Sequence, residues 1–349
     1  MLKMLGALFR ADPPHSPATS VFEAGVAPEA HVTLDSGESF PIRAHLSSVN
    51  GIPVPEWDAV WAWVESLDGN ALRNQAWTAC ERNWLGHVAQ ALGSNYRLAE
   101  NETAMLVSTQ DNRAATVTLN YMSKTLRRIV RVLDGVALVP EMGKDLLILF
   151  EDADAYYQYV ARYYPDEGEF AASGGMYVNH GCGHFVSVRS ELHALEPVIA
   201  HEMTHACLSH LPIPAWLNEG LAVNTENRLS PSGRPLFTPE EMHAKHRQFW
   251  GEAEIQQFWS GKSFLRNDDG NLLSYDLSRI LVEHFAADWE SFRLFANEAD
   301  LADAGEGAAL RHLGIDLGHA VCALLEQPHH PGWDPDPASW QEPPEKGAF

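Results

Sequence analysis

The chain has 349 residues, of which 45% are hydrophobic and 20% charged, a composition typical of a globular protein with a substantial core. A formal net charge of −23 argues against nucleic acid as a partner, because a duplex would be repelled. No apolar stretch reaches membrane-spanning length, which argues against a membrane partner. The cysteines lack disulfide-framework spacing, so we expect a reduced, cytoplasmic protein; the sequence indicates no oligomeric state.

The N-terminal quarter divides into two stretches. Residues 1–20 are predicted to form a flexible arm, and residues 21–94 a region of short strands followed by helices. Tryptophans recur at near-helical spacing between residues 56 and 93. Such a stripe is more typical of a core than of a binding site.

From residue 95 the pattern changes to strands separated by helices, and then to helices alone. Pro-rich residues 326–349 are predicted to be a disordered tail. This order predicts an α+β fold with one main domain over residues 95–325. The predicted strands are 96–98, 105–108, 146–150, 176–178 and 185–188, and the predicted helices before the all-helical part are 112–133 and 152–164.

Residues 201–205 read His-Glu-Met-Thr-His, the pattern that carries the chemistry. Two histidines four residues apart lie on one face of a helix, so His201 and His205 can reach one metal ion. Glu202 is then free to face a metal-activated water and accept its proton. Apolar neighbours on both sides suit a buried helix, and Pro197 suits its start.

A catalytic zinc site needs a third protein ligand and an open position. The segment Pro-Ala-Trp-Leu-Asn-Glu-Gly-Leu-Ala, residues 214–222, offers Glu219 on a helix that a short proline turn can fold back against the first. The competing interpretation makes Glu219 a surface carboxylate and His201 and His205 core residues. Because the His-Glu-Met-Thr-His motif and Glu219 occur together at this spacing, we favour a zinc site over this interpretation.

The two motifs together resemble the gluzincin zinc metallopeptidases, most closely the bacterial peptidase MA-like family and more distantly the aminopeptidase-N-like enzymes. The resemblance implies a thermolysin-like catalytic domain over residues 95–325, with a mixed sheet upstream of the zinc helix and a mostly helical C-terminal half. It implies one Zn²⁺ per chain, held by His201, His205 and Glu219, with Glu202 as general base. The glutamate of the family's exopeptidase signature is absent at residues 175–179, so the mode of cleavage stays open.

Three residues outside the motif are further candidates. By the same resemblance, Tyr275 occupies the place of a tyrosine that stabilises the oxyanion, with a core aromatic as the alternative. Glu226 is either a support for a zinc ligand or a surface charge. Arg279 is either a docking site for a substrate carboxylate or, as we favour, an ion-paired surface residue.

Residues 179–184, Asn-His-Gly-Cys-Gly-His, carry three possible ligands within a short glycine-containing run. A second metal, a substrate-lining loop and a plain loop are the three interpretations. The resemblance implies that residues 176–188 supply an edge strand for extended substrate. We expect Cys207, two residues after His205, to be a core thiol.

Three functional hypotheses follow. The first is a zinc-dependent peptidase with a peptide or protein substrate, in which Glu202 takes a proton from water and returns it to the leaving amine. The second is a binding or scaffold protein of gluzincin fold without turnover; the intact Glu202 argues against it. The third is a zinc hydrolase of a non-peptide amide or ester.

Overall fold

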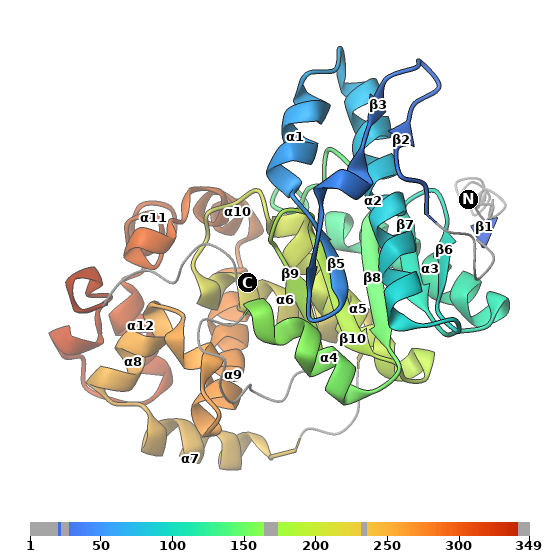
Figure 1. Cartoon of the computed structure of the whole chain (residues 1–349). Helices are drawn as coiled ribbons and strands as arrows, with labels where there is room; N and C mark the ends of the chain where they lie inside the picture. Colours follow the sequence, from blue (N-terminus) through green and yellow to red (C-terminus); the bar gives the residue numbers. More distant parts are fainter. Residues whose placement is uncertain (1–19, 22–27, 164–173, 232–235, 341–349) are drawn as a thin grey trace, which may run out of the picture.

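The computed structural model describes residues 20–21, 28–163, 174–231 and 236–340, and Figure 1 follows the chain through them. Of the predicted arm, residues 1–20, only Ser20 is described. The structure is mixed α/β and is built round a six-stranded mixed sheet with helices against both faces. This architecture fits the predicted α+β class.

The N-terminal part places short strands before helices, as predicted. Trp57, Trp77 and Trp84 are buried. The ring centroid of Trp57 lies 5.4 Å from that of Trp77 and 5.3 Å from that of Trp84. These three tryptophans are therefore core residues, whereas Trp61 is 41% exposed. The elements are β2 (Val32–Thr33), β3 (Ser39–Phe40), η1 (Ile42–His45), β4 (Leu46–Val49), β5 (Ile52–Pro55), α1 (Trp57–Glu65) and α2 (Asn70–Leu92).

The main sheet has the strand order β1-β6-β7-β8-β10-β9. The neighbours β7, β8 and β10 run parallel, and the pairs on either side of them are antiparallel. Strand β9 therefore forms one edge of the sheet. The strands are β1 (Ser20–Val21), β6 (Arg97–Glu100), β7 (Ala104–Ser108), β8 (Asp145–Phe150), β9 (Gly175–Val178) and β10 (His184–Val188).

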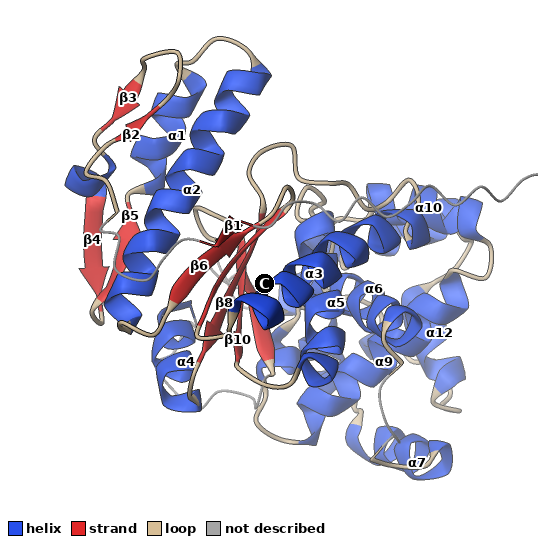
Figure 2. Cartoon of the chain, turned by 90° about the vertical axis from the view of Figure 1, so that its right-hand side faces the viewer, coloured by secondary structure: helices blue, strands red, loops and turns tan. Residues whose placement is uncertain are grey.

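Strand β8 shows why the sheet is covered on both faces, because its whole length is buried. Leu147 and Leu149 join the core formed with α3 (Asn112–Val132) and α5 (Leu192–Leu208). Leu146, Ile148 and Phe150 join the core formed with α1 and α2. Alternate side chains of a strand point to opposite faces, so an unbroken apolar run fits a sheet between two layers. Figure 2 shows these layers edge-on. Helices α1 and α2 thus share a core with the sheet across the predicted boundary at residue 95.

Helices make up the regular structure of the described residues after β10. Several begin at side-chain caps: Asp111 accepts the Ala114 N–H at the start of α3, and Thr238 and Glu241 form a capping box on α7. The helices of this half and the two between the strands are α3 (Asn112–Val132), α4 (Ala153–Val160) with η2 (Ala161–Tyr163), α5 (Leu192–Leu208), α6 (Ala215–Leu229), α7 (Pro239–Phe249), α8 (Glu252–Trp259), η3 (Lys262–Leu265), α9 (Asp269–Phe285), α10 (Trp289–Glu298), η4 (Leu301–Asp303), α11 (Glu306–His312) and α12 (Leu317–Leu324).

The start of α5 differs from the sequence prediction. The helix begins at Leu192, and Pro197 lies inside it rather than at its start. A proline within a helix removes one backbone hydrogen bond, and packing of the helix compensates for this loss. Leu195 and Ile199, on either side of Pro197, are buried in the core, which explains how the early turns persist.

The C-terminal segment corrects the prediction of a disordered tail from residue 326. Residues 331–333 and 337–339 form 3₁₀ turns, η5 (Pro331–Trp333) and η6 (Pro337–Ser339). Trp333 is buried, and its carbonyl accepts the indole N–H of Trp259. The proline-rich composition suggested disorder because the segment has little periodicity, whereas one large buried aromatic side chain, that of Trp333, holds it against the core. Residues 341–349 lie outside the described part.

Candidate metal centre

Helices α5 and α6 carry the predicted ligands and are joined through residues 209–214. Ile213 in this connection is buried, and Pro214 stands at the N-terminus of α6. The two helices pack against each other along their length. The connection is therefore short and fixed, and it brings the side chain of Glu219 to the histidine face of α5.

The three predicted ligands converge on one point. One ligand atom from each of His201, His205 and Glu219 lies within 4.8 Å of the other two. Glu219 Oε2 is 3.2 Å from His201 Nε2 and 3.5 Å from His205 Nε2. Glu219 and His205 are buried, and the His201 side chain is 14% exposed. Two imidazole nitrogens and one carboxylate oxygen at this spacing are the donor set of a three-ligand zinc site.

Each histidine is oriented by a second contact on its other ring nitrogen. His201 Nδ1 is 3.1 Å from Glu226 Oε2, and His205 Nδ1 is 3.0 Å from Asn218 Oδ1. Because each Nδ1–H can donate to its oxygen, a ring that gives up the Nε2 proton becomes the neutral tautomer that binds a metal. Glu226 thus has the supporting position considered from the sequence. Asn218 was missed, although it directly precedes Glu219 in the Trp-Leu-Asn-Glu run.

The electrostatics of the ligands follow from their contacts. Burial raises the pKa of Glu219, but the charge of His205 and the hydrogen bonds from both imidazoles outweigh burial and hold the pKa well below its ordinary value. Burial lowers the pKa of His201, yet hydrogen bonds to Glu219 and Glu226 raise it well above the usual range. Glu219 is therefore a carboxylate in this environment, the form that binds cations.

Glu202 lies between α5 and the edge strand β9. It is buried, and burial raises its pKa, while the charges of His201 and His205 and a hydrogen bond from the Tyr177 backbone oppose the increase. A Cβ at Gly175 would lie 2.5 Å from Val198 Cγ1 and 3.5 Å from Glu202 Oε1. The glycine therefore permits β9 to pass close to the Glu202 carboxyl group.

Tyr275 reaches the same region from α9. Its ring centroid is 6.2 Å from that of His201, and the Phe264 ring packs edge-on against it at 5.3 Å. Gly220, next to Glu219, sets this approach, because a Cβ there would lie 2.6 Å from the Ser278 carbonyl oxygen of α9. The close crossing of α6 and α9 thus puts Tyr275 beside a predicted ligand.

Arg279 is ion-paired, as the sequence interpretation favoured. Its guanidinium contacts Asp276 at 2.9 Å and Glu283 at 3.0 Å. Asp276 also accepts from His246 Nε2 at 2.9 Å, and the His246 ring accepts the Trp250 indole N–H on its other nitrogen. This arginine belongs to a network that joins α7 and α9.

The loop 179–184 does not gather its three candidate ligands. Metal-capable groups among the described residues do not include His180, Cys182 or His184. His184 is buried; its Nδ1 lies 2.7 Å from the Cys182 carbonyl, and its Nε2 lies 2.7 Å from the Tyr159 hydroxyl. Burial lowers the pKa of His184 to about 4, so the ring is neutral. The described residues give no support to a second metal in this loop, because both ring nitrogens of His184 make structural contacts.

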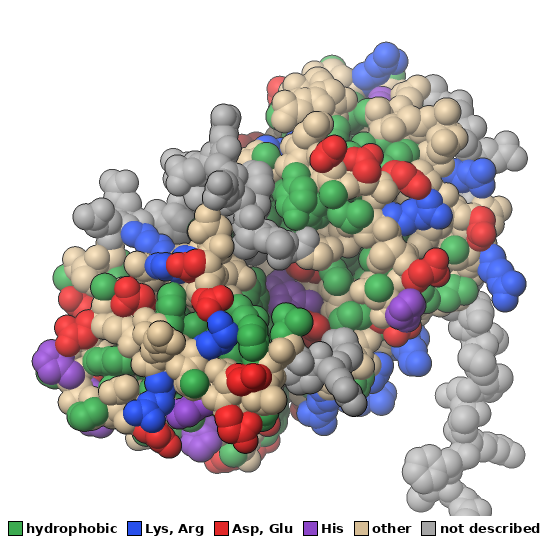
Figure 3. All heavy atoms as spheres, turned by 90° about the horizontal axis from the view of Figure 1, so that it is seen from below, with side chains coloured by type: hydrophobic (Ala, Val, Ile, Leu, Met, Phe, Trp, Pro, Cys, Tyr) green, Lys and Arg blue, Asp and Glu red, His purple; other side chains and the backbone are tan. Residues whose placement is uncertain are grey.

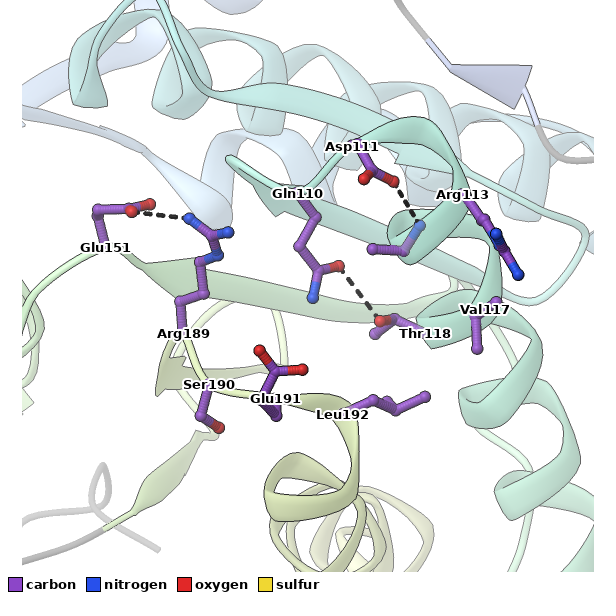
Figure 4. A pocket seen from close by; sticks show the side chains of 11 residues that line it. Gln110, Asp111, Arg113, Val117, Thr118, Glu151, Arg189, Ser190, Glu191 and Leu192 are labelled. Carbon is purple, nitrogen blue, oxygen red and sulfur yellow. Dashed lines mark hydrogen bonds and ion pairs between the residues drawn. The ribbon is translucent and has the colours of Figure 1, made fainter.

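A separate polar cavity of about 740 Å³ lies at the carboxyl ends of β7, β8 and β10 (Figure 4). Its polar groups are largely engaged with one another. Arg189 pairs with Glu151 at 2.7 Å, Gln110 Oε1 accepts from Thr118, and Asp111 caps α3. No sequence motif pointed to this cavity, and it does not include the residues of the His201 cluster.

The face seen from below is hollowed between its two halves, and histidine side chains lie in the hollow (Figure 3). Lysines and arginines are scattered among acidic residues on this face.

In the part of the chain that the structure describes, no helix is long and apolar enough to cross a bilayer. The chain matches no protein-family model, and neither the curated proteins nor the solved structures contain a significant match.

Proposed function

We propose that this chain is a zinc-dependent peptidase of the gluzincin type. The observation that carries the proposal is the convergence of His201 Nε2, His205 Nε2 and Glu219 Oε2, with an outer hydrogen-bond partner on each imidazole. Core histidines need no shared carboxylate and no such matched orientation. A mixed sheet before the ligand helix and a helical half after it also fit a thermolysin-like catalytic domain.

The residues divide the chemistry among them. His201, His205 and Glu219 would hold Zn²⁺, and the bound ion would supply the Lewis acidity that lowers the pKa of a water molecule toward neutrality. Glu202 accepts a proton from the attacking water and returns it to the leaving amine. Tyr275 donates its hydroxyl proton in a hydrogen bond to the oxygen on which negative charge develops. Glu226 and Asn218 hold the two imidazoles in place.

A peptide substrate suits the position of β9. The strand is at the sheet edge, and Gly175 and Tyr177 bring its backbone close to Glu202. An extended peptide can add to such an edge through main-chain hydrogen bonds. Burial raises the pKa of Glu202, but His201 and His205 lie close enough for their charges to oppose the increase, and this position beside the proposed ligands favours an enzyme over a scaffold protein.

The test is digestion of a peptide library by the wild type and by Glu202→Gln after loading both with zinc. We expect about one zinc per chain at His201, His205 and Glu219 in both proteins and cleavage by the wild type alone. Glu240→Gln, an exposed glutamate on α7, is the matched control and should cleave as the wild type does. The cleaved bonds also distinguish exopeptidase from endopeptidase action.

Other outcomes have separate meanings. Equal cleavage by the Glu202→Gln variant removes Glu202 as base. Zinc binding without cleavage of any peptide by the wild type contradicts the peptidase proposal, and a parallel panel of esters and non-peptide amides then tests the third hypothesis. Failure of the wild type to bind zinc overturns the metal centre itself.

A further inference from the structure

A second group of metal-type ligands lies where α12 meets the C-terminal segment. Asp316 is the N-cap of α12, His319 is in its first turn, and His329 follows the helix in the chain. One ligand atom from each of these residues lies within 4.8 Å of the other two. None of the three belongs to the site on α5 and α6.

The two imidazoles of this group are held face to face. The rings of His319 and His329 stack with centroids 3.5 Å apart and planes inclined by 14°. His319 Nδ1 is 3.0 Å from Asp316 Oδ1. Rotation of the rings out of this stack would turn a nitrogen of each histidine, together with an oxygen of Asp316, toward one ion.

Asp334 provides the supporting contact that metal-binding histidines have. Its Oδ1 is 2.7 Å from His329 Nε2, which leaves His329 Nδ1 as the ligand nitrogen. A carboxylate that accepts the outer N–H of an imidazole fixes its tautomer and makes it a better ligand. The arrangement repeats, on different residues, the contact that Glu226 makes with His201.

Negative charge around the group favours a cation. In the described part of the chain, neither Asp316 nor Asp334 forms an ion pair with a lysine or arginine. Glu306 adds a third carboxylate, which accepts the Leu317 N–H at 3.0 Å. These charges offset the positive end of the α12 dipole, which by itself would repel a cation.

We propose that Asp316, His319 and His329 form a second metal site, which takes a divalent ion of the zinc class. Two imidazoles and a carboxylate, with no thiolate, suit Zn²⁺ and neighbouring late transition metals rather than Mg²⁺ or Ca²⁺. Water completes the coordination, because the His319 side chain is 60% exposed. The site is independent of the proposed peptidase function.

The role of this ion is to fasten the C-terminal segment to α12. The segment already lies on α8, where Gln256 Nε2 donates to the carbonyls of Gly332 and Asp334. A metal shared by His319 and His329 adds a link between the helix and the segment. Opening of residues 326–340 then requires loss of the ion, so zinc should reduce local unfolding there.

The experiment compares zinc binding by the full chain in a His201→Ala plus His205→Ala background, which removes the first site. Equilibrium dialysis should give about one bound zinc per chain, and adding His319→Ala plus His329→Ala should abolish it. The matched control adds His31→Ala plus His193→Ala, two exposed histidines elsewhere, and should keep the ion. Asp334→Asn should weaken binding by about 10- to 100-fold.

Hydrogen exchange gives a second measurement on the same proteins. Zinc should slow amide exchange in residues 326–340 of the background protein and leave the variant without His319 and His329 unchanged. Absence of bound zinc in the background protein, or equal loss in the matched control, overturns the second site. Neither result bears on zinc at His201 and His205, which is measured in the His319→Ala plus His329→Ala protein that keeps both of these histidines.

Discussion

Buried carboxyl groups occur in two regions of this molecule, and they differ in their neighbours. Glu219 on α6 faces two imidazoles, which lower its pKa despite burial. Glu81 on α2 and Asp145 at the start of β8 have no such partners, and burial raises their pKa values to about 8 and about 7. Burial alone makes an acid neutral, whereas imidazoles keep it anionic and able to bind a cation.

The contacts of Glu81 show a structural acid. Its carboxyl accepts the Lys144 N–H at 3.1 Å and lies 3.6 Å from Cys182 Sγ. Any side chain at Gly143 would collide with this carboxyl group, and the φ of +79° at Gly143 also requires glycine. Glu81 thus closes the core between α2 and the loop before β8, whereas Glu219 completes the cluster proposed to bind a metal.

The largest expected effect separates these two carboxyl groups directly. Glu219→Gln should lose zinc, with hydrolysis falling below detection, because a neutral amide is a poor ligand and two imidazoles alone hold zinc weakly. Glu81→Gln is the matched change and should keep both. The peptide digest measures hydrolysis, and elemental analysis measures zinc content in proteins that also carry His319→Ala plus His329→Ala, so that only the site on α5 and α6 is counted. Zinc retained in Glu219→Gln would contradict the assignment of the third ligand.

Tyr275→Phe should reduce kcat by about 10²-fold with little change in KM, because it removes one donor to the developing oxyanion. Zinc content should not change, since the ring packing against Phe264 is kept. Tyr157→Phe, a tyrosine on α4, provides the matched control. An unaltered kcat would make Tyr275 a packing residue only.

Asn218→Ala should weaken zinc binding by about 10- to 100-fold, because His205 loses the partner that fixes its orientation. Competition with a chelator of known affinity measures the change. Asn224→Ala, also on α6 but bonded to backbone carbonyls, is the control. Equal zinc affinity in wild type and Asn218→Ala would show that packing alone orients His205.

The smallest effect concerns pH and Glu81. Because the folded pKa, about 8, exceeds the ordinary 4.5, stability from this group is complete below pH 4.5 and is lost as pH rises through 8. Relative to wild type, Glu81→Gln should therefore gain stability over this window, by at most about 1.4 kcal/mol per pH unit. Urea unfolding of both proteins at several pH values measures the difference between their free energies of unfolding. Parallel stability curves would contradict the raised pKa.

Local pattern was sufficient for most elements and for the centre of the site. Apolar runs predicted β7, β8 and β10, and the His-Glu-Met-Thr-His spacing placed His201 and His205 on one helix face. Predictions from local sequence pattern were wrong where long-range packing compensates for locally unfavourable residues. The early turns of α5 persist around Pro197, and the segment with Trp333 is ordered by its anchor in the core.

The types of the proposed ligands and their helical spacing can be read from the sequence alone, because the period of an α-helix is a local property of the backbone. Only the tertiary structure decided that Glu219 meets both imidazoles, that Asn218 and Glu226 orient them, and that His184 is a buried structural residue. The same is true of the group at His319 and His329. These meetings depend on how helices cross, which the close approach at Gly220 permits and which no local spacing specifies.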